Sequence, residues 1–596
     1  MKQAHWRGCN PSSTVLGAPV PDCCRVPDSR NEESLFCTGP SLARRATHGI
    51  TSWSVAPGAE PLEAARGGPG GAAAVVRRIK IPQPHTPQGP VNMTSFTKIA
   101  DCEQPVITVN PNHKISAIED NMYGGFTEHM GRCIYGGIYE PGSPLSDENG
   151  FRKDVIEAMR ELKCPVVRYP GGNFCATYHW MDGIGPREKR PKKSELAWLG
   201  VESNQFGTDE FIKWCRIVGA EPYIALNMGT GTLEEALGWV EYCNSTQDTY
   251  YANLRRQNGH EEPYNVKYWA LGNEMWGDWQ VEQMTKEDYA KKAYQWAKAL
   301  KLQDPSIELI LCGKEGNDGW DYHVLKECIK FNRQAFGNNG CLIEMHSIHL
   351  YTCSDDHNQN AVAPRAAEKA IEITAALIDL VRIENKIPPG VRKQKICFDE
   401  WNVWDSRRAH GRDGAEEKYT LSDALAVANW LNVFVRQSKH IAMANIAQSV
   451  NVISPLTTTP DGLIKQTTWW PLLLFSRYMR GSALAVHVRS PEYEGETKPA
   501  WIRGLVETPW LDASASVRDG VVSLVVVNVH EDRAFPTAVE GLPAGGADVD
   551  VFTVSGRAVG CTNMERQEVG IVESKWDGRG LYEFPKASMT MLRWRA

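Results

Sequence analysis

The feature that most constrains this 596-residue chain is an alternation of short β-type runs with amphipathic helical stretches. The intervals between successive runs are long enough for the crossover helix that joins parallel strands. Eight such βα units predict an α/β fold, a closed (β/α)8 TIM barrel. The predicted strands are Tyr123–Phe126, Pro165–Tyr169, Pro222–Leu226, Tyr268–Leu271, Leu309–Cys312, Ser347–Leu350, Ile396–Phe398 and Ala444–Ala447.

Helical periodicity is clearest between these runs, and it ends near residue 483. From there the chain is β-rich, with Gly, Pro and Asp turns between the apolar segments. This pattern predicts a C-terminal antiparallel β-sandwich of jelly-roll-like size over 483–596, after a barrel over 117–482. The predicted helices are Asp154–Leu162, Asp209–Val218, Leu233–Tyr242, Lys286–Leu302, Ala366–Val381 and Leu421–Val435. The predicted sandwich strands are Leu484–Val488, Val521–Val529, Val549–Val554 and Ser588–Trp594.

Residues 1–92 have a different texture, rich in Pro, Gly, Ala, Ser and Arg, with neither helical nor strand periodicity. We interpret them as a disordered extension, a transit peptide or the result of a start codon assigned too early. The acidic residues Asp22, Asp28, Glu32 and Glu33 argue against the transit peptide, because such peptides avoid acids.

Charge and hydropathy narrow the class of partner. The formal net charge is -7 and the pI is about 6.1, which gives no basic footprint for nucleic acid. No run approaches the roughly 18 to 20 apolar residues of a membrane span. The first residues lack the apolar block of a secretory signal, so we expect a cytoplasmic protein, with a secreted one as the open alternative. The 16 cysteines form no paired zinc-ligand spacing and are expected to be reduced.

Polar residues gather where the predicted barrel strands end, and active sites of such barrels lie at that end. Amides and carboxylates hydrogen-bond hydroxyl groups in both directions, and indole rings cover the apolar faces of sugars. The set therefore suits a neutral polyhydroxylated ligand. It comprises Glu128, Arg168, Asn173, Asn227, Asn273, Glu274, His349, Tyr351, Glu400 and Gln448, with Trp276, Trp401 and Trp404 beside them.

Glu274 and Glu400 carry the sharpest hypothesis, because they follow the fourth and seventh strands and should face each other across the barrel mouth. Retaining glycoside hydrolysis needs two carboxyl groups about 5–5.5 Å apart, one as acid and then base, the other as nucleophile. Two negative charges this close repel each other, so one of the pair is expected to hold a proton. The commoner fate of a single Glu is an ion pair or a helix cap.

Other interpretations stay open for this set. Arg168 could tie the barrel base to a carboxylate, although the Pro170-Gly-Gly that follows favours the mouth. His346 and His349 would point to opposite faces of a strand, which disfavours a metal. The same barrel and carboxylates could serve an endo-glucanase or a β-xylosidase. A glycan-binding protein without catalysis is the alternative from another class.

Four motifs carry a resemblance to a known family. They are the runs from Tyr123 (YGGFTEHMGRCIY), Arg168 (RYPGGNF), Ala270 (ALGNEMWG) and Phe398 (FDEWNVW). With the runs from Trp180, Met443 and Leu511, the chain from about Thr94 to its end resembles the α-L-arabinofuranosidases of glycoside hydrolase family 51. Residues 1–92 take no part in the resemblance.

The resemblance implies retaining, exo-acting hydrolysis of terminal α-L-arabinofuranosyl groups on arabinoxylan- or arabinan-derived oligosaccharides or polysaccharides. It implies no metal or organic cofactor, a homo-oligomer, and a strand from 93–116 added to the β-sandwich. Glu274 matches the family's acid/base and Glu400 its nucleophile. The positions that match those around the furanose are Glu128, Arg168, Asn173, Asn273, His349, Tyr351 and Gln448. Trp198 and Trp404 are candidates for apolar contact with the sugar ring or the leaving group.

Overall fold

The computed structural model describes residues 93–332, 340–404, 415–543 and 545–596, and within them eight parallel strands form one sheet. Their order is β12-β11-β10-β9-β8-β7-β4-β3, and a parallel bridge between Gly124 and Asn445 closes the sheet. The predicted (β/α)8 barrel is therefore confirmed. Its strands are β3 (Gly125–Phe126), β4 (Val166–Tyr169), β7 (Glu221–Ala225), β8 (Tyr268–Leu271), β9 (Glu308–Leu311), β10 (Met345–Thr352), β11 (Lys395–Val403) and β12 (Ile441–Ile446).

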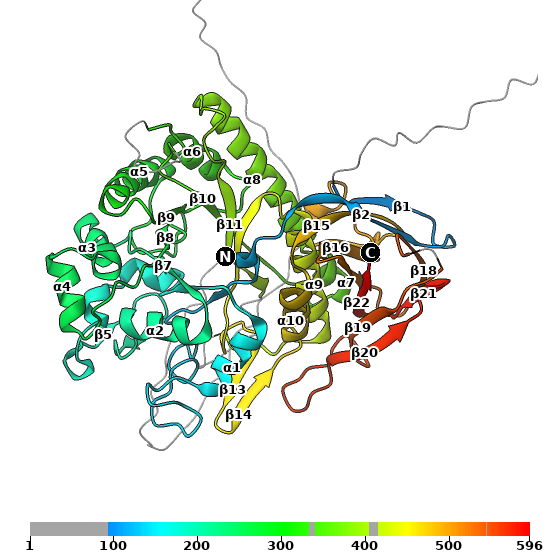
Figure 1. The fold of residues 1–596 in the computed structure, drawn as a ribbon, viewed down its shortest axis with the longest axis horizontal. Helices are drawn as coiled ribbons and strands as arrows, with labels where there is room; N and C mark the ends of the chain where they lie inside the picture. The colour runs from blue at the N-terminus through cyan, green and yellow to red at the C-terminus, as the bar shows by residue number, and fades with distance from the viewer. Residues whose placement is uncertain (1–92, 333–339, 405–414, 544) are drawn as a thin grey trace, which may run out of the picture. The chain divides into compact units, whose positions relative to one another are not determined.

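Helices surround the barrel strands (Figure 1). Those that the sequence pattern indicates are α1 (Lys153–Leu162), α2 (Thr208–Val218), α3 (Leu233–Asn244), α5 (Lys286–Gln303), α8 (Arg365–Glu384) and α9 (Leu421–Arg436). The pattern does not indicate α4 (Tyr250–Gln257), α6 (Gly319–Cys328), α7 (His357–Val362) or α10 (Trp469–Tyr478). α4 and α7 have at most eight residues, too few turns for a clear apolar periodicity, whereas α6 and α10 are as long as α1 but their apolar residues do not form one distinct stripe.

Local chemistry fixes where the longer helices begin. The Thr285 hydroxyl accepts a hydrogen bond from the Asp288 backbone N–H at the start of α5. Thr420 and Asp423 form a reciprocal capping box at the start of α9. Such caps satisfy backbone N–H groups that have no partner inside the helix.

The barrel interior is a packed core rather than a channel. Side chains from neighbouring strands, including Val166, Tyr223, Ile310, Met345 and Met443, form one buried cluster inside it. A larger apolar cluster fills the space between the strands and the surrounding helices. The polar residues of the site lie at or just beyond the carboxyl ends of the strands, which is where barrels of this type place their active sites.

The C-terminal region forms a ten-stranded sheet in the order β20-β19-β22-β17-β16-β15-β2-β18-β21, with β1 paired to β15. Its core contains Val486, Leu524, Val526, Leu592 and Trp594. The β-sandwich prediction is confirmed, with one difference: β1 with β15 and β18 with β2 pair in parallel. The strands are β1 (Ser95–Lys98), β2 (Val106–Ala117), β15 (Ser482–Ser490), β16 (Leu511–Arg518), β17 (Val521–Asn528), β18 (Phe535–Glu540), β19 (Val549–Ser555), β20 (Gly570–Trp576), β21 (Leu581–Phe584) and β22 (Ser588–Arg595).

A buried ionic cluster joins this sheet to the barrel. The Arg436 guanidinium, on α9, lies 2.6 Å from Asp512 Oδ1 on β16 and 2.9 Å from Glu368 Oε2 on α8. Arg365 also pairs with Glu368. Although burial opposes ionisation, the two arginines lower the pKa of Glu368 to about 2.

Several expectations concern regions or properties outside the barrel and the sheet. The prediction for residues 1–92 lies outside the described residues. The cysteines in the described ranges are free thiols, and all of them except Cys102 are buried. Among the described residues, no helix is both long enough and apolar enough to cross a membrane.

Candidate active site

The polar residues predicted at the strand ends converge at the carboxyl-terminal mouth of the barrel. Arg168 comes from β4, His349 and Tyr351 from β10, and Glu400 from β11. Glu128 and Gln448 follow β3 and β12, and Asn273 and Glu274 follow β8. The hydrogen bonds and ion pairs described below join these side chains into two groups, one around Glu400 and one around Glu128. Asn227 is the exception, because its amide donates to the Tyr178 carbonyl and to Thr230 and so holds the loop after β7.

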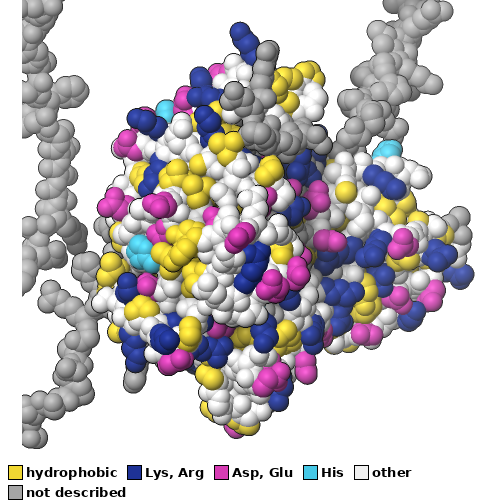
Figure 2. Space-filling model, turned by 60° about the vertical axis from the view of Figure 1, so that its left-hand side comes forward, with side chains coloured by type: hydrophobic (Ala, Val, Ile, Leu, Met, Phe, Trp, Pro, Cys, Tyr) yellow, Lys and Arg dark blue, Asp and Glu magenta, His cyan; other side chains and the backbone are white. Residues whose placement is uncertain are grey.

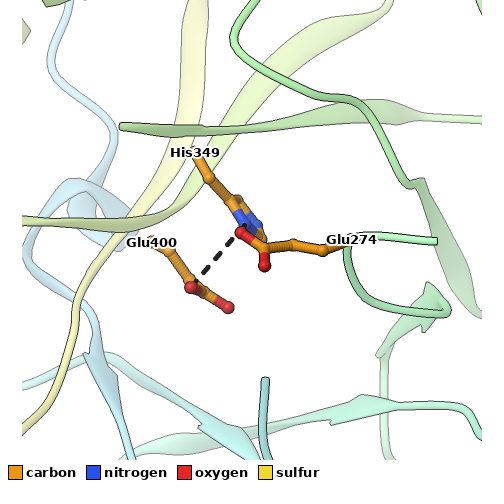
Figure 3. A group of neighbouring side chains, drawn as sticks. All are labelled: Glu274, His349 and Glu400. Carbon is orange, nitrogen blue, oxygen red and sulfur yellow. Dashed lines mark hydrogen bonds and ion pairs between the residues drawn. The ribbon is translucent and has the colours of Figure 1, made fainter. Parts of the chain in front are cut away.

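Glu274 and Glu400 approach each other closely, with His349 beside both (Figure 3). One carboxylate oxygen of each glutamate and one imidazole nitrogen lie within 4.8 Å of one another. His349 Nδ1 is 3.0 Å from Glu274 Oε1 and 3.6 Å from Glu400 Oε2. The two glutamates therefore face one another across a single small space.

His349 itself is buried in a negative environment. Burial opposes a charge on the ring, but Glu400, Asp399 and Glu274 outweigh it and raise the pKa of His349 to about 10. The ring is thus a cation at neutral pH. Glu274, His349 and Glu400 are donor types that could also ligate a metal, and in this structure the imidazole is within hydrogen-bond distance of Glu274.

Arg168 lies at the mouth, not at the base of the barrel. Its side chain is 1% exposed and lies 2.5 Å from Glu400 Oε1. It also donates to Asn273 Oδ1 at 2.6 Å, and the Asn273 amide in turn reaches Asn173 Oδ1 at 3.4 Å. A fixed guanidinium of this kind orients the Glu400 carboxylate.

Tyr351 holds the other oxygen of Glu400. Its hydroxyl donates to Glu400 Oε2 at 2.8 Å. Burial and the charge of Glu400 raise the pKa of Tyr351 well above its ordinary value, so it remains a phenol and a donor. Its ring meets the Trp404 ring edge-on, with centroids 5.3 Å apart, which places Trp404 at the same side of the site.

A third carboxyl group, Glu128, forms a separate part of the pocket. It accepts hydrogen bonds from the Phe174 backbone N–H at 3.2 Å, Trp198 Nε1 at 3.1 Å and Gln448 Nε2 at 2.9 Å. Gly171 makes room for it, because a Cβ there would lie 3.0 Å from Glu128 Oε1. Burial, followed by the charge of Glu400, raises the pKa of Glu128 to about 8 despite these donors.

Two residues that the sequence pattern did not single out belong to the site: Trp279 contacts Glu274, and Asp399 contacts His349 and Arg168. Trp279 Nε1 donates to Glu274 Oε2 at 3.1 Å. Asp399 lies 3.3 Å from His349 Nε2 and 3.4 Å from Arg168 Nε. Trp279 stands five residues beyond Glu274 in a loop, where no periodicity predicts a contact.

Asp399 was missed for a different reason. In a regular strand, consecutive residues point to opposite faces, so Asp399 should point away from Glu400. The register of β11 is irregular with both of its neighbours. Its pairing with β12 shifts between Phe398 and Trp401. Its pairing with β10 shifts between Ser347 and His349 of β10. Such irregularities re-aim side chains, and here both Asp399 and Glu400 reach Arg168.

Comparison with known proteins agrees with this geometry. Residues 158–362 match the model of the α-L-arabinofuranosidase 1 domain, and residues 399–588 match that of the α-L-arabinofuranosidase C-terminal domain. A relative from Aspergillus terreus, named probable α-L-arabinofuranosidase C, is 66% identical over 85% of this chain and 100% of its own length. An intracellular exo-α-(1→5)-L-arabinofuranosidase from Halalkalibacterium halodurans is 37% identical over 72% of this chain and 85% of its own length.

Solved structures give the same result. The α-L-arabinofuranosidase from Thermotoga maritima, solved as an arabinose complex, has a TM-score of 0.75 and 40% identity, covering 83% of this chain and all of its own. The GH51 α-L-arabinofuranosidase from Thermotoga petrophila has a TM-score of 0.74 and 39% identity, covering 82% of this chain and all of its own. The chain therefore belongs to glycoside hydrolase family 51, the retaining α-L-arabinofuranosidases.

Proposed function

We propose that this enzyme removes terminal arabinofuranosyl groups with Glu400 as nucleophile and Glu274 as acid/base. The observation that carries the assignment is the short separation of the two carboxylates, which have oxygens within 4.8 Å of each other. Inverting enzymes keep their carboxyl groups about 6.5–9.5 Å apart to seat a water molecule between one of them and the sugar. The closer spacing supports direct attack by one carboxylate.

The surroundings of each carboxylate support its role. Arg168 and Tyr351 hold the two oxygens of Glu400, which fixes the orientation of its carboxyl group. Glu274 comes from a loop, and its side chain keeps 13% exposure, so it can reach a leaving group at the mouth. A nucleophile needs a fixed anion, and an acid/base needs access to the leaving oxygen and to water.

The reaction proceeds in two balanced steps. In the first, Glu400 bonds to the anomeric carbon, the glycosidic bond breaks, and Glu274 gives its proton to the leaving oxygen. In the second, Glu274 takes a proton from water while the water oxygen bonds to the same carbon and Glu400 departs as a carboxylate. Both glutamates return to their starting states, and the configuration of the sugar is retained.

The substrates that fit are arabinose-substituted oligosaccharides from arabinoxylan or arabinan, from which the enzyme removes terminal arabinofuranosyl groups. The pocket offers amides, carboxyl groups and a phenol for sugar hydroxyls, while Trp198, at 37% exposure, provides an indole near Glu128. On the face that Figure 2 shows, Lys and Arg side chains lie among Asp and Glu side chains. An uncharged sugar polymer needs no basic surface. The exo-acting relative named above supports cleavage of terminal groups.

Two variants test the proposal. Glu400→Ala should abolish turnover of every arabinofuranoside while the thermal unfolding midpoint changes little. Glu274→Ala should slow arabinosylated xylo-oligosaccharides by about 10²–10⁴-fold, the usual contribution of a general acid, but aryl arabinofuranosides with good leaving groups much less. Product stereochemistry followed by proton NMR should show retention. Wild-type rates in either variant, or an inverted product, would contradict the assignment.

A further inference from the structure

Asp399 is a buried charged group for which the two-step mechanism has no role. Its carboxylate is 1% exposed and uses both oxygens. Oδ1 accepts from Ser347 Oγ at 2.5 Å and lies 3.3 Å from His349 Nε2. Oδ2 accepts from the Tyr223 hydroxyl at 2.7 Å and lies 3.4 Å from Arg168 Nε. Burying a charged group costs free energy unless it is paired and hydrogen-bonded, as this one is.

The contacts of Asp399 determine the proton state of His349. Although burial opposes its charge, Arg168, His349 and Ser347 lower the pKa of Asp399 well below its ordinary value, so it is a carboxylate with acceptors only. His349 Nε2 must then carry a hydrogen toward it. The second ring nitrogen, Nδ1, faces Glu274 and Glu400, as Figure 3 shows.

The charged groups around the His349 ring come from three elements, and a fourth element adds a hydroxyl group. Asp399 and Glu400 approach from β11, Glu274 from the loop after β8, and Arg168 from β4 beyond the two β11 carboxylates. From β10 itself, Ser347 Oγ lies 3.1 Å from Nε2. Three carboxylates thus surround one imidazole, and only Asp399 takes no part in bond making.

We propose that Asp399 is a positioning residue that keeps His349 protonated and aimed at the catalytic pair. This rests on the proposed roles of Glu274 and Glu400. Before the first step the negative charge is on Glu400, 3.6 Å from His349 Nδ1. After it, Glu400 is an uncharged ester and the charge is on Glu274, 3.0 Å from the same nitrogen. One fixed N–H cation therefore stabilises whichever carboxylate is charged, and no proton leaves His349.

The effect should depend on the leaving group. Without Asp399, His349 no longer stabilises the Glu274 carboxylate that forms as the leaving oxygen is protonated. Substrates that need this proton should suffer, whereas those with good leaving groups should suffer little. If Asp399 served only to hold Arg168 and Glu400, attack by the nucleophile would be weakened, and every substrate would be slowed alike.

The experiment compares Asp399→Asn with wild type on an arabinosylated xylo-oligosaccharide and on dinitrophenyl α-L-arabinofuranoside. We expect kcat/KM to fall by about 10²-fold on the first and by less than about tenfold on the second, with KM little changed. The alkaline limb of the pH profile should move down by about one unit or more, because His349 then loses its proton more readily. Equal losses on both substrates, or an unmoved limb, would overturn the proposal.

A double-mutant cycle and a control locate the effect. In a His349→Gln background, Asp399→Asn should add little, because both changes remove the same interaction, whereas additive losses would refute the link. Tyr223→Phe is the matched control, since it deletes the hydroxyl at Oδ2 and leaves the His349 side intact. It should not reproduce the leaving-group dependence; if it does, the packing of Asp399 is responsible and the proposal is wrong.

Two further measurements distinguish a failure of this inference from a failure of folding and from a failure of the proposed function. Thermal unfolding reports whether Asp399→Asn folds. If it does not, Ser347→Ala, which removes a donor at Oδ1, should show the same leaving-group pattern more weakly, and its absence would count against us. If the wild-type enzyme had no activity on the aryl arabinofuranoside, both the proposed function and this inference would be refuted. Normal behaviour of Asp399→Asn would refute the inference alone.

Discussion

The hydrogen bond between Trp279 and Glu274 gives a direct test of what stabilises the proposed acid/base. Trp279 Nε1 donates to Glu274 Oε2 at 3.1 Å. The indole is fixed in place, because it packs against Gly277, where a Cβ would lie 2.6 Å from the ring, and meets Trp276 edge-on at 5.1 Å. Trp279→Phe removes the N–H and keeps most of the packing.

The size of the effect follows from the strength of this bond. A hydrogen bond to a charged group contributes about 1.5–3 kcal/mol. Glu274 keeps 13% side-chain exposure, so we take the lower end, which is about a factor of ten. The N–H stabilises the carboxylate that forms on Glu274 as the leaving oxygen is protonated, so its loss should lower kcat/KM on an arabinosylated xylo-oligosaccharide about tenfold. Substrates with good leaving groups should lose much less.

The assay compares kcat/KM on an arabinosylated xylo-oligosaccharide with kcat/KM on dinitrophenyl α-L-arabinofuranoside. Trp276→Phe is the matched control, since the Trp276 N–H donates to the Gly313 carbonyl and not to Glu274. It should leave both values near those of the wild type. A wild-type value for Trp279→Phe on the oligosaccharide, or equal losses on both substrates, would refute the reasoning from hydrogen bonding.

Three further outcomes are expected. Glu368→Gln should lower the thermal unfolding midpoint at pH 7, because a shift in the pKa of Glu368 from 4.5 to about 2 corresponds to about 3 kcal/mol of stability. That stability is present above pH 4.5 and is lost as the pH falls toward 2, so the midpoints of wild type and variant should converge in acid. Glu128, with a pKa of about 8, should gain charge beside Glu400 above that pH, so a KM for arabinofuranosides that stays flat to pH 9.5 would contradict its neutral state. Gly171→Ala should reduce kcat/KM at least about tenfold, since its Cβ would lie 3.0 Å from Glu128 Oε1, while a wild-type rate would show that the pocket yields.

The sequence alone determined the barrel and brought forward the two glutamates that we propose as catalytic. Helical and strand periodicities are local properties, so the alternation of elements could be read without contacts. Glu274 and Glu400 follow from the same reading, because parallel strands in a barrel end at one rim and the residues there must converge. The sandwich strand contributed by residues before the barrel was anticipated only through the resemblance to a family.

The tertiary structure decided how Glu274 and Glu400 are surrounded. Asp399 faces the site only because β11 loses its regular register with β10 and β12, and no alternation rule predicts where that happens. Trp279 reaches Glu274 through a loop whose path depends on packing against Gly277. The placement of His349 between carboxylates from separate strands requires a closed barrel. Closure of the barrel by residues far apart in the sequence sets these distances, and local periodicity carries no information about how the barrel closes.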